Sequence, residues 1–361
     1  MSVTFSNAAR RCWQPRRLGA RVSSRAVSQK TYTLNTGAQM PAIGFGTFQD
    51  KDKQESAVYH ALNAGFRHID TAYAFRTESA VRNAMRKAGV RREDVFLTTK
   101  LWCTCFHPDD VETALDRSLR FLGTDYVDLF LMHYPCAWKR DATRIFPKMK
   151  KHGSRPMGDT KYIDTWKTME TLPKDKVRAI GVSNFSRGEV QTLLDEGSVV
   201  PAVHQMELHP YLQQTSFADW HRAQGIHVTQ FSPLGNTNPY YRSIWWATGK
   251  AAGARLIIYD PVLVDVGWKH GKSAAQVALA WGLANGRSVL SKSVDETRIR
   301  ENLDSDFALD GEDVARIATL DRALRFNDPS AAFGWNLYSD LKGSGRSRKA
   351  SRPAWRPSCA P

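Results

Sequence analysis

The body of the chain alternates short apolar runs with stretches in which apolar residues recur every three or four positions. The run Ile43 to Thr47 predicts a buried strand, because it is short and almost wholly apolar or small. Apolar residues at helical spacing between positions 57 and 62 predict a helix that ends at Gly65, since glycine readily adopts the left-handed conformation that closes helices. The run Phe66 to Asp70 predicts the next strand. The regular part of the chain therefore begins as strand, helix, strand.

The same signals repeat along the chain, after an initial hairpin predicted around Asn35-Thr36-Gly37. The six further predicted strands are Val95 to Thr99, Val127 to His133, Val177 to Val182, Val203 to Glu207, Ile226 to Phe231 and Ser288 to Ser291. Each is followed by helical spacing, so the total is eight βα units in about 300 residues, which favours a closed (β/α)₈ barrel. A doubly wound open sheet is the alternative. However, Gly44 and Gly46 lack the third glycine and the later acid of a Rossmann fingerprint.

The charge of the chain is concentrated at its two ends. The formal net charge is +15, but residues 1–30 carry seven Lys or Arg and no acid, and residues 342–361 carry six and no acid. The remaining +2 belongs to residues 31–341, so the predicted barrel is nearly neutral and does not resemble a nucleic-acid clamp. The first segment is similar to a mitochondrial presequence, with a plain basic extension or a misassigned start as alternatives, and the last reads as a disordered tail. A cytoplasmic or mitochondrial location follows.

Composition excludes several other classes of protein. Apolar residues make up 42% of the chain, enough for a large core, and no run approaches the roughly 18 apolar residues of a membrane-spanning helix. Five cysteines form no disulfide framework and indicate a reducing compartment. A metal site built from Cys103, Cys105, Cys136 and His107 is an alternative, but the second CxxC-type pair that makes zinc sites convincing is missing.

Polar residues stand where three successive predicted strands end. Asp70 ends the second strand, Lys100 follows the third and His133 ends the fourth. Because the chemistry of (β/α)₈ barrels lies at the carboxyl ends of the strands, these side chains are expected to converge into a proton-handling cluster. The alternative is a structural ion pair beside a buried histidine.

Eight stretches, in this order, make the chain resemble the aldo-keto reductase family. They are GFGTF (44–48), RHIDTAY (67–73), FLTTKLW (96–102), DLFLMHYP (128–135), GVSNF (181–185), QMELHPY (205–211), SPLG (232–235) and KSVDETRIREN (292–302). The resemblance spans residues 31–341 and implies a barrel that binds NADPH and passes hydride to an aldehyde or ketone, or the reverse. It also implies a small-molecule carbonyl or alcohol substrate and a monomer, with no nucleic-acid or membrane partner.

The resemblance assigns catalytic roles to Asp70, Lys100 and His133, three members of a tetrad of Asp, Tyr, Lys and His. The fourth position holds Phe75 instead of tyrosine, whereas Tyr73 matches an aromatic position that is not catalytic. The tyrosine would donate the proton to the developing alkoxide, and a benzyl ring has none to give. Two alternatives therefore stay open: a reductase that still turns over, with an acid such as His133, and a non-catalytic relative that binds NADPH as a cofactor-sensing or partner-binding subunit.

The cofactor positions implied by the resemblance are largely present. Those assigned to the nicotinamide amide are Ser183, Asn184 and Gln205, with Phe231 stacked on the ring. Further cofactor-binding positions are Gly46, Thr47, Ser232 and Leu234. Those assigned to the 2′-phosphate and the adenine are Lys292, Ser293, Arg298, Glu301 and Asn302. Asp295 departs from the family pattern, which usually has Thr or another neutral residue at this position. A carboxylate near the phosphate would weaken NADPH binding or shift the preference toward NADH, unless its side chain turns to solvent.

The substrate positions implied by the resemblance are Phe48, Trp102 and Tyr134, together with His133, and ordinary barrel packing is the alternative reading of the aromatic residues. They favour apolar or aryl carbonyl compounds. Segments 136–160 and 236–259 follow the fourth and seventh strands and are expected to form pocket loops.

Overall fold

The computed structural model of the chain describes residues 30–141, 144–150, 153–238 and 253–341. The predictions made for both basic tails fall almost wholly outside these ranges, as does much of the expected loop 236–259.

Eight parallel strands close into a barrel, as predicted, in the order β10-β3-β4-β5-β6-β7-β8-β9. The strands are β3 (Ile43–Gly46), β4 (His68–Asp70), β5 (Phe96–Leu101), β6 (Leu129–Met132), β7 (Ile180–Ser183), β8 (Val203–Glu207), β9 (His227–Phe231) and β10 (Ser288–Ser291). Closure leaves no barrel strand with a bare edge, because β10 pairs with both β3 and β9. The fold is therefore a (β/α)₈ barrel, and the open doubly wound sheet is excluded.

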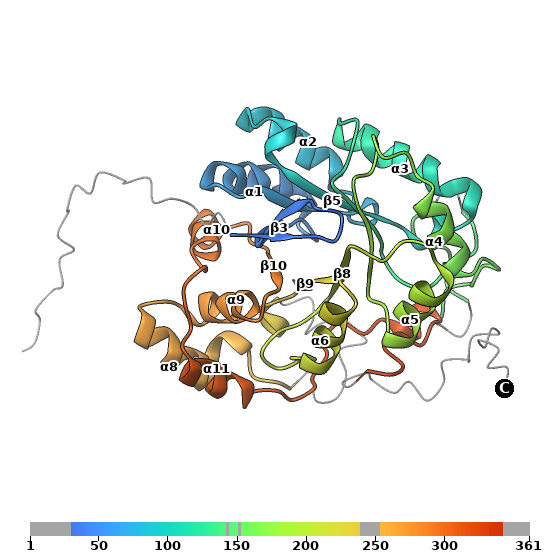
Figure 1. Cartoon of the computed structure of the whole chain (residues 1–361). Helices are drawn as coiled ribbons and strands as arrows, with labels where there is room; N and C mark the ends of the chain where they lie inside the picture. The colour runs from blue at the N-terminus through green and yellow to red at the C-terminus, as the bar shows by residue number, and fades with distance from the viewer. Residues whose placement is uncertain (1–29, 142–143, 151–152, 239–252, 342–361) are drawn as a thin grey trace, which may run out of the picture.

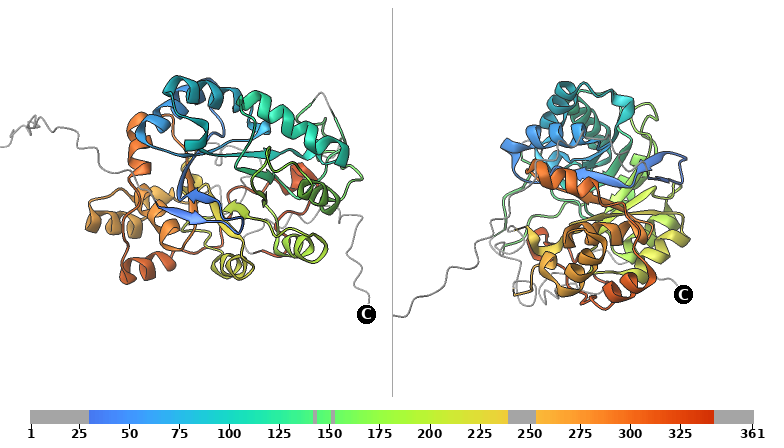
Figure 2. Two further views of the ribbon diagram at one scale, coloured as in Figure 1. Left: turned by 45° about the horizontal axis from the view of Figure 1, so that its top comes forward. Right: turned by 90° about the vertical axis from the view of Figure 1, so that its left-hand side faces the viewer.

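Helices surround the strands on all sides (Figure 1), and the two further views in Figure 2 show the same enclosure. They are α1 (Lys51–Ala64), α2 (Glu78–Ala88), α3 (Pro108–Leu122), α4 (Tyr162–Glu170), α5 (Arg187–Glu196), α6 (Thr215–Ala223), α8 (Pro261–His270), α9 (Ala274–Ala284), α10 (Glu296–Leu303), α11 (Gly311–Ala318) and α12 (Ser330–Phe333). Gly65 closes α1 in the left-handed conformation, at φ 114°, as its position predicts. Within the described ranges, no helix is both long and apolar enough to cross a membrane.

The predicted hairpin is present as β1 (Thr31–Thr33) and β2 (Gln39–Pro41), which pair in antiparallel register. Leu34 and Met40 from this hairpin are buried in one cluster with apolar side chains of β5 and β6, among them Phe96 and Leu129. The hairpin therefore covers the amino-terminal end of the barrel and leaves the carboxyl ends of the strands for the site.

Some predicted strand bounds were wrong by one to three residues. The strand predicted from Val177 begins at Ile180, because Val177 forms only an isolated bridge with Val127. In the other direction, β5 extends past the predicted Thr99 to Leu101, which places Lys100 within a strand. Apolar runs overestimate strand length where buried residues lead into a strand without pairing in the sheet.

Candidate active site

The carboxyl ends of β4 and β5 bring Asp70 and Lys100 into direct contact. Lys100 Nζ donates to Asp70 Oδ1 at 2.6 Å and to the carbonyl of Thr71 at 2.9 Å. The Lys100 side chain is only 1% exposed and that of Asp70 only 5%, so the ion pair is buried. Burial lowers the pKa of Lys100, and the Asp70 carboxylate opposes that shift. The ammonium group is thus held in place by two short hydrogen bonds.

Neighbouring polar groups complete this buried network. Gln205 Nε2, from β8, donates to the second oxygen of Asp70 at 2.7 Å. Behind Lys100, the hydroxyl of Thr99 donates to Glu78 Oε1 at 2.7 Å, and burial raises the pKa of Glu78 to about 7. The orientation of Asp70 is therefore set from two sides, by Lys100 and by Gln205.

Phe75 lies against Lys100 and His133. It belongs to a 3₁₀ turn, Tyr73–Phe75, directly after β4. Its ring centroid is 5.1 Å from Lys100 Nζ and 5.4 Å from the centroid of His133, with the two rings edge to face. Lys100 therefore meets an aromatic ring, a contact that contributes about 0.5–2 kcal/mol, and no hydroxyl group. The structure thus places a phenyl ring, which has no hydroxyl proton to donate, at the position that the resemblance gives to the proton-donating tyrosine.

His133 follows β6 and is buried between aromatic rings. Its ring lies 5.0 Å from Trp102, edge to face, and is stacked on Tyr134 at 5.1 Å. Burial lowers the pKa of His133 well below its usual value, and the charge of Lys100 lowers it further. Its Nδ1 is buried and has no hydrogen-bond partner among the described residues. At neutral pH the side chain is therefore a neutral imidazole with one N–H to offer.

The positions expected to hold the nicotinamide amide gather beside this cluster. Asn184 Nδ2 donates to the carbonyl of His133 and to Ser183 Oγ, both at 3.0 Å. Asn184 adopts a left-handed backbone, at φ 63°, and its Oδ1 accepts from the hydroxyl of Tyr338 at 2.7 Å. With Gln205 on the next strand, buried amide and hydroxyl groups line the end of the barrel beside His133. This donor and acceptor set fits a carboxamide.

The positions expected to hold the 2′-phosphate lie at the end of β10 and the start of α10. Lys292 forms an ion pair with Asp50 from the loop after β3, and Ser293 is nearly buried. Arg298 lies in the first turn of α10, with 69% of its side chain exposed. Two cations at a helix N-terminus suit a phosphate dianion.

Asp295 plays a structural part at this helix. Its carboxylate accepts from the backbone N–H of Arg298 at 2.9 Å and caps α10, with 46% of the side chain exposed. The cap fixes one carboxylate oxygen on the backbone of α10, while nearly half of the side chain remains open to solvent.

The remaining predicted positions are spread around the same end. The partly buried ones are Gly46, Phe48, Phe231, Ser232 and Leu234, the buried ones are Thr47 and Asn302, and Glu301 is exposed. A hydrogen bond of 2.7 Å from Asn238 Nδ2 to Gln49 Oε1 joins the segment after β9 to the loop after β3. Sequence reasoning missed this contact, because neither residue belongs to a regular element.

Aromatic side chains crowd the substrate side. Trp102 and Tyr134 are 3% and 8% exposed, and Phe333 lies 4.6 Å from Tyr134. Phe146 lies 5.3 Å from Trp102 and is 45% exposed. Phe333 and Tyr338 were not among the predicted residues. The sequence feature that could have indicated them is the aromatic-rich stretch 326–338, which follows α11.

The alternative metal site is wrong for the described part of the chain, where no group of three or more His, Cys, Asp or Glu side chains could hold an ion. Cys103 and Cys136 do meet, with their sulfur atoms 3.8 Å apart. His107 instead caps α3, accepting from the backbone N–H of Asp109 at 3.4 Å.

Comparison with known proteins places this geometry in a family. A model of the Aldo/keto reductase family matches residues 34–322. The chain belongs to the aldo/keto reductase family. Members of this family are oxidoreductases that use nicotinamide cofactors. The resemblance inferred from the eight sequence stretches is confirmed.

Curated aldo-keto reductases match most of the chain. Glycerol 2-dehydrogenase (NADP(+)) of Saccharomyces cerevisiae is 39% identical over 305 residues, which are 82% of this chain and 92% of the yeast protein. NAD(P)H-dependent D-xylose reductase of Scheffersomyces stipitis is 39% identical over 315 residues, covering 82% and 95% of the two chains. D/L-glyceraldehyde reductase of Hypocrea jecorina is 37% identical over 316 residues, covering 84% and 91%.

Proposed function

We propose that this protein binds NADPH at the carboxyl end of the barrel and reduces small aldehydes or ketones to alcohols, at a rate limited by proton donation. The observation that carries the proposal is the buried Asp70–Lys100 pair beside His133, with the ring of Phe75 between Lys100 and His133. The yeast relative, a glycerol 2-dehydrogenase (NADP(+)), supports the choice of cofactor.

The residues present fit the cofactor. Ser183, Asn184 and Gln205 would hold the carboxamide, whereas Lys292 and Arg298 would hold the 2′-phosphate. When bound, NADPH supplies the hydride. Because Arg298 lies in the first turn of α10, the helix dipole adds to its attraction for the phosphate, whereas Lys292 approaches from the end of β10.

The chain's own residues act on the carbonyl oxygen of the substrate. The neutral His133 donates a hydrogen bond, which stabilises negative charge as it develops on that oxygen. Asp70 holds the ammonium group of Lys100 at 5.1 Å from the ring centre of Phe75. This ring carries no phenol group that the positive charge of Lys100 could acidify. The proton must therefore come from the small protonated fraction of His133 or from water, and either source is slower than a positioned acid.

We expect carbonyl reduction by the unaltered protein to speed up as the pH falls. Burial lowers the pKa of His133, so its protonated fraction at neutral pH is small and grows about tenfold for each pH unit of acidification. The measurement is kcat with saturating NADPH between about pH 6 and pH 8, the range in which histidine ordinarily titrates. The variant His133→Gln should remove the slope, and a flat profile in the unaltered protein would assign the proton to water.

Replacing Lys292 by methionine should weaken NADPH far more than NADH. Only NADPH carries the 2′-phosphate, and a charge-assisted hydrogen bond contributes about 1.5–3 kcal/mol, so a loss of about 10- to 100-fold is expected for NADPH alone. The measurement is fluorescence titration with each cofactor. Lys176→Met is the matched control, because Lys176 pairs with Glu112 and Asp116 near the opposite end of the barrel. Equal losses for both cofactors would overturn the assignment of Lys292.

The presence of Phe75 in place of tyrosine also favours a second candidate function. In this alternative the protein is an NADPH-binding subunit that senses the cofactor or binds a partner, and it does not reduce a carbonyl compound. A cofactor titration followed by a turnover assay on a panel of aldehydes separates the two. Tight binding without turnover, both in the unaltered protein and in Phe75→Tyr, would favour the subunit.

A further inference from the structure

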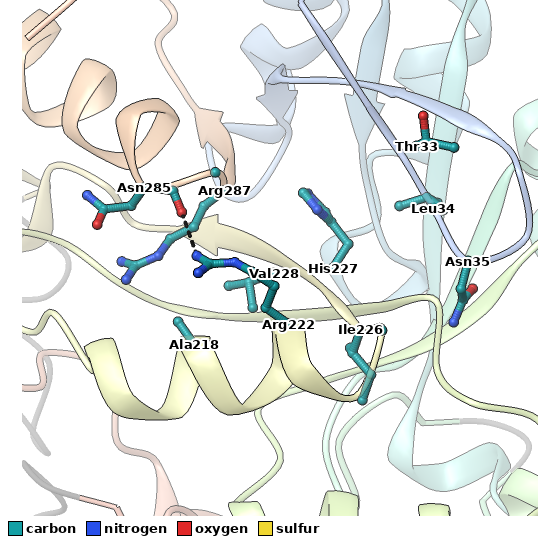
Figure 3. Close-up of a pocket in the computed structure, with 12 residues that line it drawn as sticks. Thr33, Leu34, Asn35, Ala218, Arg222, Ile226, His227, Val228, Asn285 and Arg287 are labelled. Atoms are coloured by element: carbon teal, nitrogen blue, oxygen red, sulfur yellow. Dashed lines mark hydrogen bonds between the residues drawn. The ribbon is translucent and has the colours of Figure 1, made fainter.

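A pocket lies at the amino-terminal end of the barrel, away from the candidate active site with Asp70 and Lys100. It has a volume of about 210 Å³ and is formed by the β1–β2 hairpin, α6 and the segments that lead into β9 and β10. Leu34, Arg222, His227 and Arg287 are among the residues that line it (Figure 3). This end of the barrel has no part in the proposed reaction.

Arg287 lines this pocket, and two of its three guanidinium nitrogens have no hydrogen-bond partner among the described residues. Its side chain is almost completely buried, at 2% exposure, and lies with its guanidinium carbon 5.1 Å from the ring centre of Trp281. Neither Nε nor Nη1 has a partner among the described residues. Burial lowers the pKa of Arg287 to about 10, so the group stays charged at neutral pH. A buried charge with unsatisfied donors is strongly unfavourable, which points to an acceptor supplied from outside the described residues.

Three backbone carbonyls near the C-terminus of α9, the helix that precedes Arg287, already accept hydrogen bonds. The carbonyls of Trp281 and Gly282, at the end of α9, accept from the backbone N–H of Asn285. The carbonyl of Leu283 accepts from the hydroxyl of Tyr32 at 3.1 Å. These three carbonyls at the C-terminus of α9 therefore already have donors other than the guanidinium group of Arg287.

The charged groups around Arg287 leave an excess of positive charge. The charges that act on it are those of Arg222, which is repulsive, and Asp219. Arg222 already binds Asp219 Oδ1 at 3.1 Å and the carbonyl of Asn285 at 3.3 Å, as the dashed line in Figure 3 marks for the latter. His227 adds no charge, because burial lowers its pKa to about 4. Two guanidinium groups thus share a single carboxylate.

We propose that this pocket binds an oxyanion, the carboxylate or phosphate group of a small molecule, between Arg287 and Arg222. Arginine presents a planar fork of donors that matches carboxylate and phosphate oxygens. The volume of about 210 Å³ equals that of roughly seven water molecules in the liquid, so a small organic acid or inorganic phosphate fits. One negative charge on the ligand would balance the pocket.

The experiment uses the full chain and two probes, sodium phosphate and sodium acetate, each titrated by calorimetry against sodium chloride at constant ionic strength. The unaltered protein should bind at least one probe, and Arg287→Met should weaken that binding at least about tenfold, the loss expected for a charge-assisted pair. The titrations are repeated in the Lys292→Met background, because the proposed cofactor site also suits a phosphate and this change removes a cation from that site. Lys176→Met is the matched control, because Lys176 lines neither site.

Each result bears on the proposal. Binding of phosphate alone or of acetate alone supports it and identifies the class of ligand. No binding of either probe, or binding that Arg287→Met leaves unchanged in the Lys292→Met background, overturns it. Binding lost only in Lys292→Met assigns the anion to the cofactor site instead. If Arg287→Met does not fold, Arg222→Gln carries the same comparison, since the Arg222 side chain is 65% exposed.

Discussion

Replacing Phe75 by tyrosine is expected to raise kcat/KM for aldehyde reduction at least about 10-fold, and up to about 100-fold, the usual contribution of a positioned general acid. The new hydroxyl would extend a ring whose centre is already 5.1 Å from Lys100 Nζ and 5.4 Å from the His133 ring. The positive charge of Lys100 would then acidify a phenol. The measurement is steady-state kinetics of the two proteins with one aldehyde and saturating NADPH.

A matched control adds the same hydroxyl to a neighbouring ring. Phe48 lies 5.0 Å from Phe75, and Phe48→Tyr should not raise the rate, because the ring placed beside both Lys100 and His133 is that of Phe75. NADPH affinity should barely change in either variant. If the unaltered protein is already fast, Phe75→Tyr changes nothing, and His133→Ala or Tyr73→Phe abolishes turnover, then another group donates the proton.

Replacing Lys100 by methionine is expected to remove most of the gain made by Phe75→Tyr and to lower the free energy of unfolding by about 3–5 kcal/mol, the usual cost of breaking a buried ion pair. Asp70 would keep its bond from Gln205 but lose its countercharge at a position where its side chain is only 5% exposed. Activity is measured in the Phe75→Tyr background, and stability by urea unfolding of each variant.

The double change Asp70→Asn with Lys100→Met is the control for this second prediction. It removes both charges, so most of the stability should return while the activity does not. A Lys100→Met protein no less stable than Lys176→Met, which alters only a surface lysine, would show that the pair is not buried in solution.

The sequence carried enough information to predict the barrel and the meeting of Asp70, Lys100 and His133. These residues stand at the ends of successive strands, and parallel strands in a barrel bring their carboxyl ends together whatever the loops do. The position of Phe75 was also predictable, because it lies only five residues beyond Asp70 on a short turn.

Contacts made by loops could not be predicted in the same way. The bond of Tyr338 to Asn184 joins residues 154 positions apart, and that of Asn238 to Gln49 joins residues 189 apart. Neither pair follows a helical or strand repeat, so no periodic signal connects its members. The lack of partners for Nε and Nη1 of Arg287 could not be predicted from the sequence either. It depends on which backbone carbonyls of α9 already accept hydrogen bonds from other groups.

One measurement tests the central claim most directly. The full chain is titrated with NADPH by fluorescence, and the same samples are then mixed with excess aldehyde while the loss of reduced nicotinamide is followed, for the unaltered protein and Phe75→Tyr side by side. We predict equal NADPH affinities, slow turnover by the unaltered protein and turnover at least about tenfold faster in Phe75→Tyr. Tight NADPH binding with no turnover in either protein would contradict the reductase assignment.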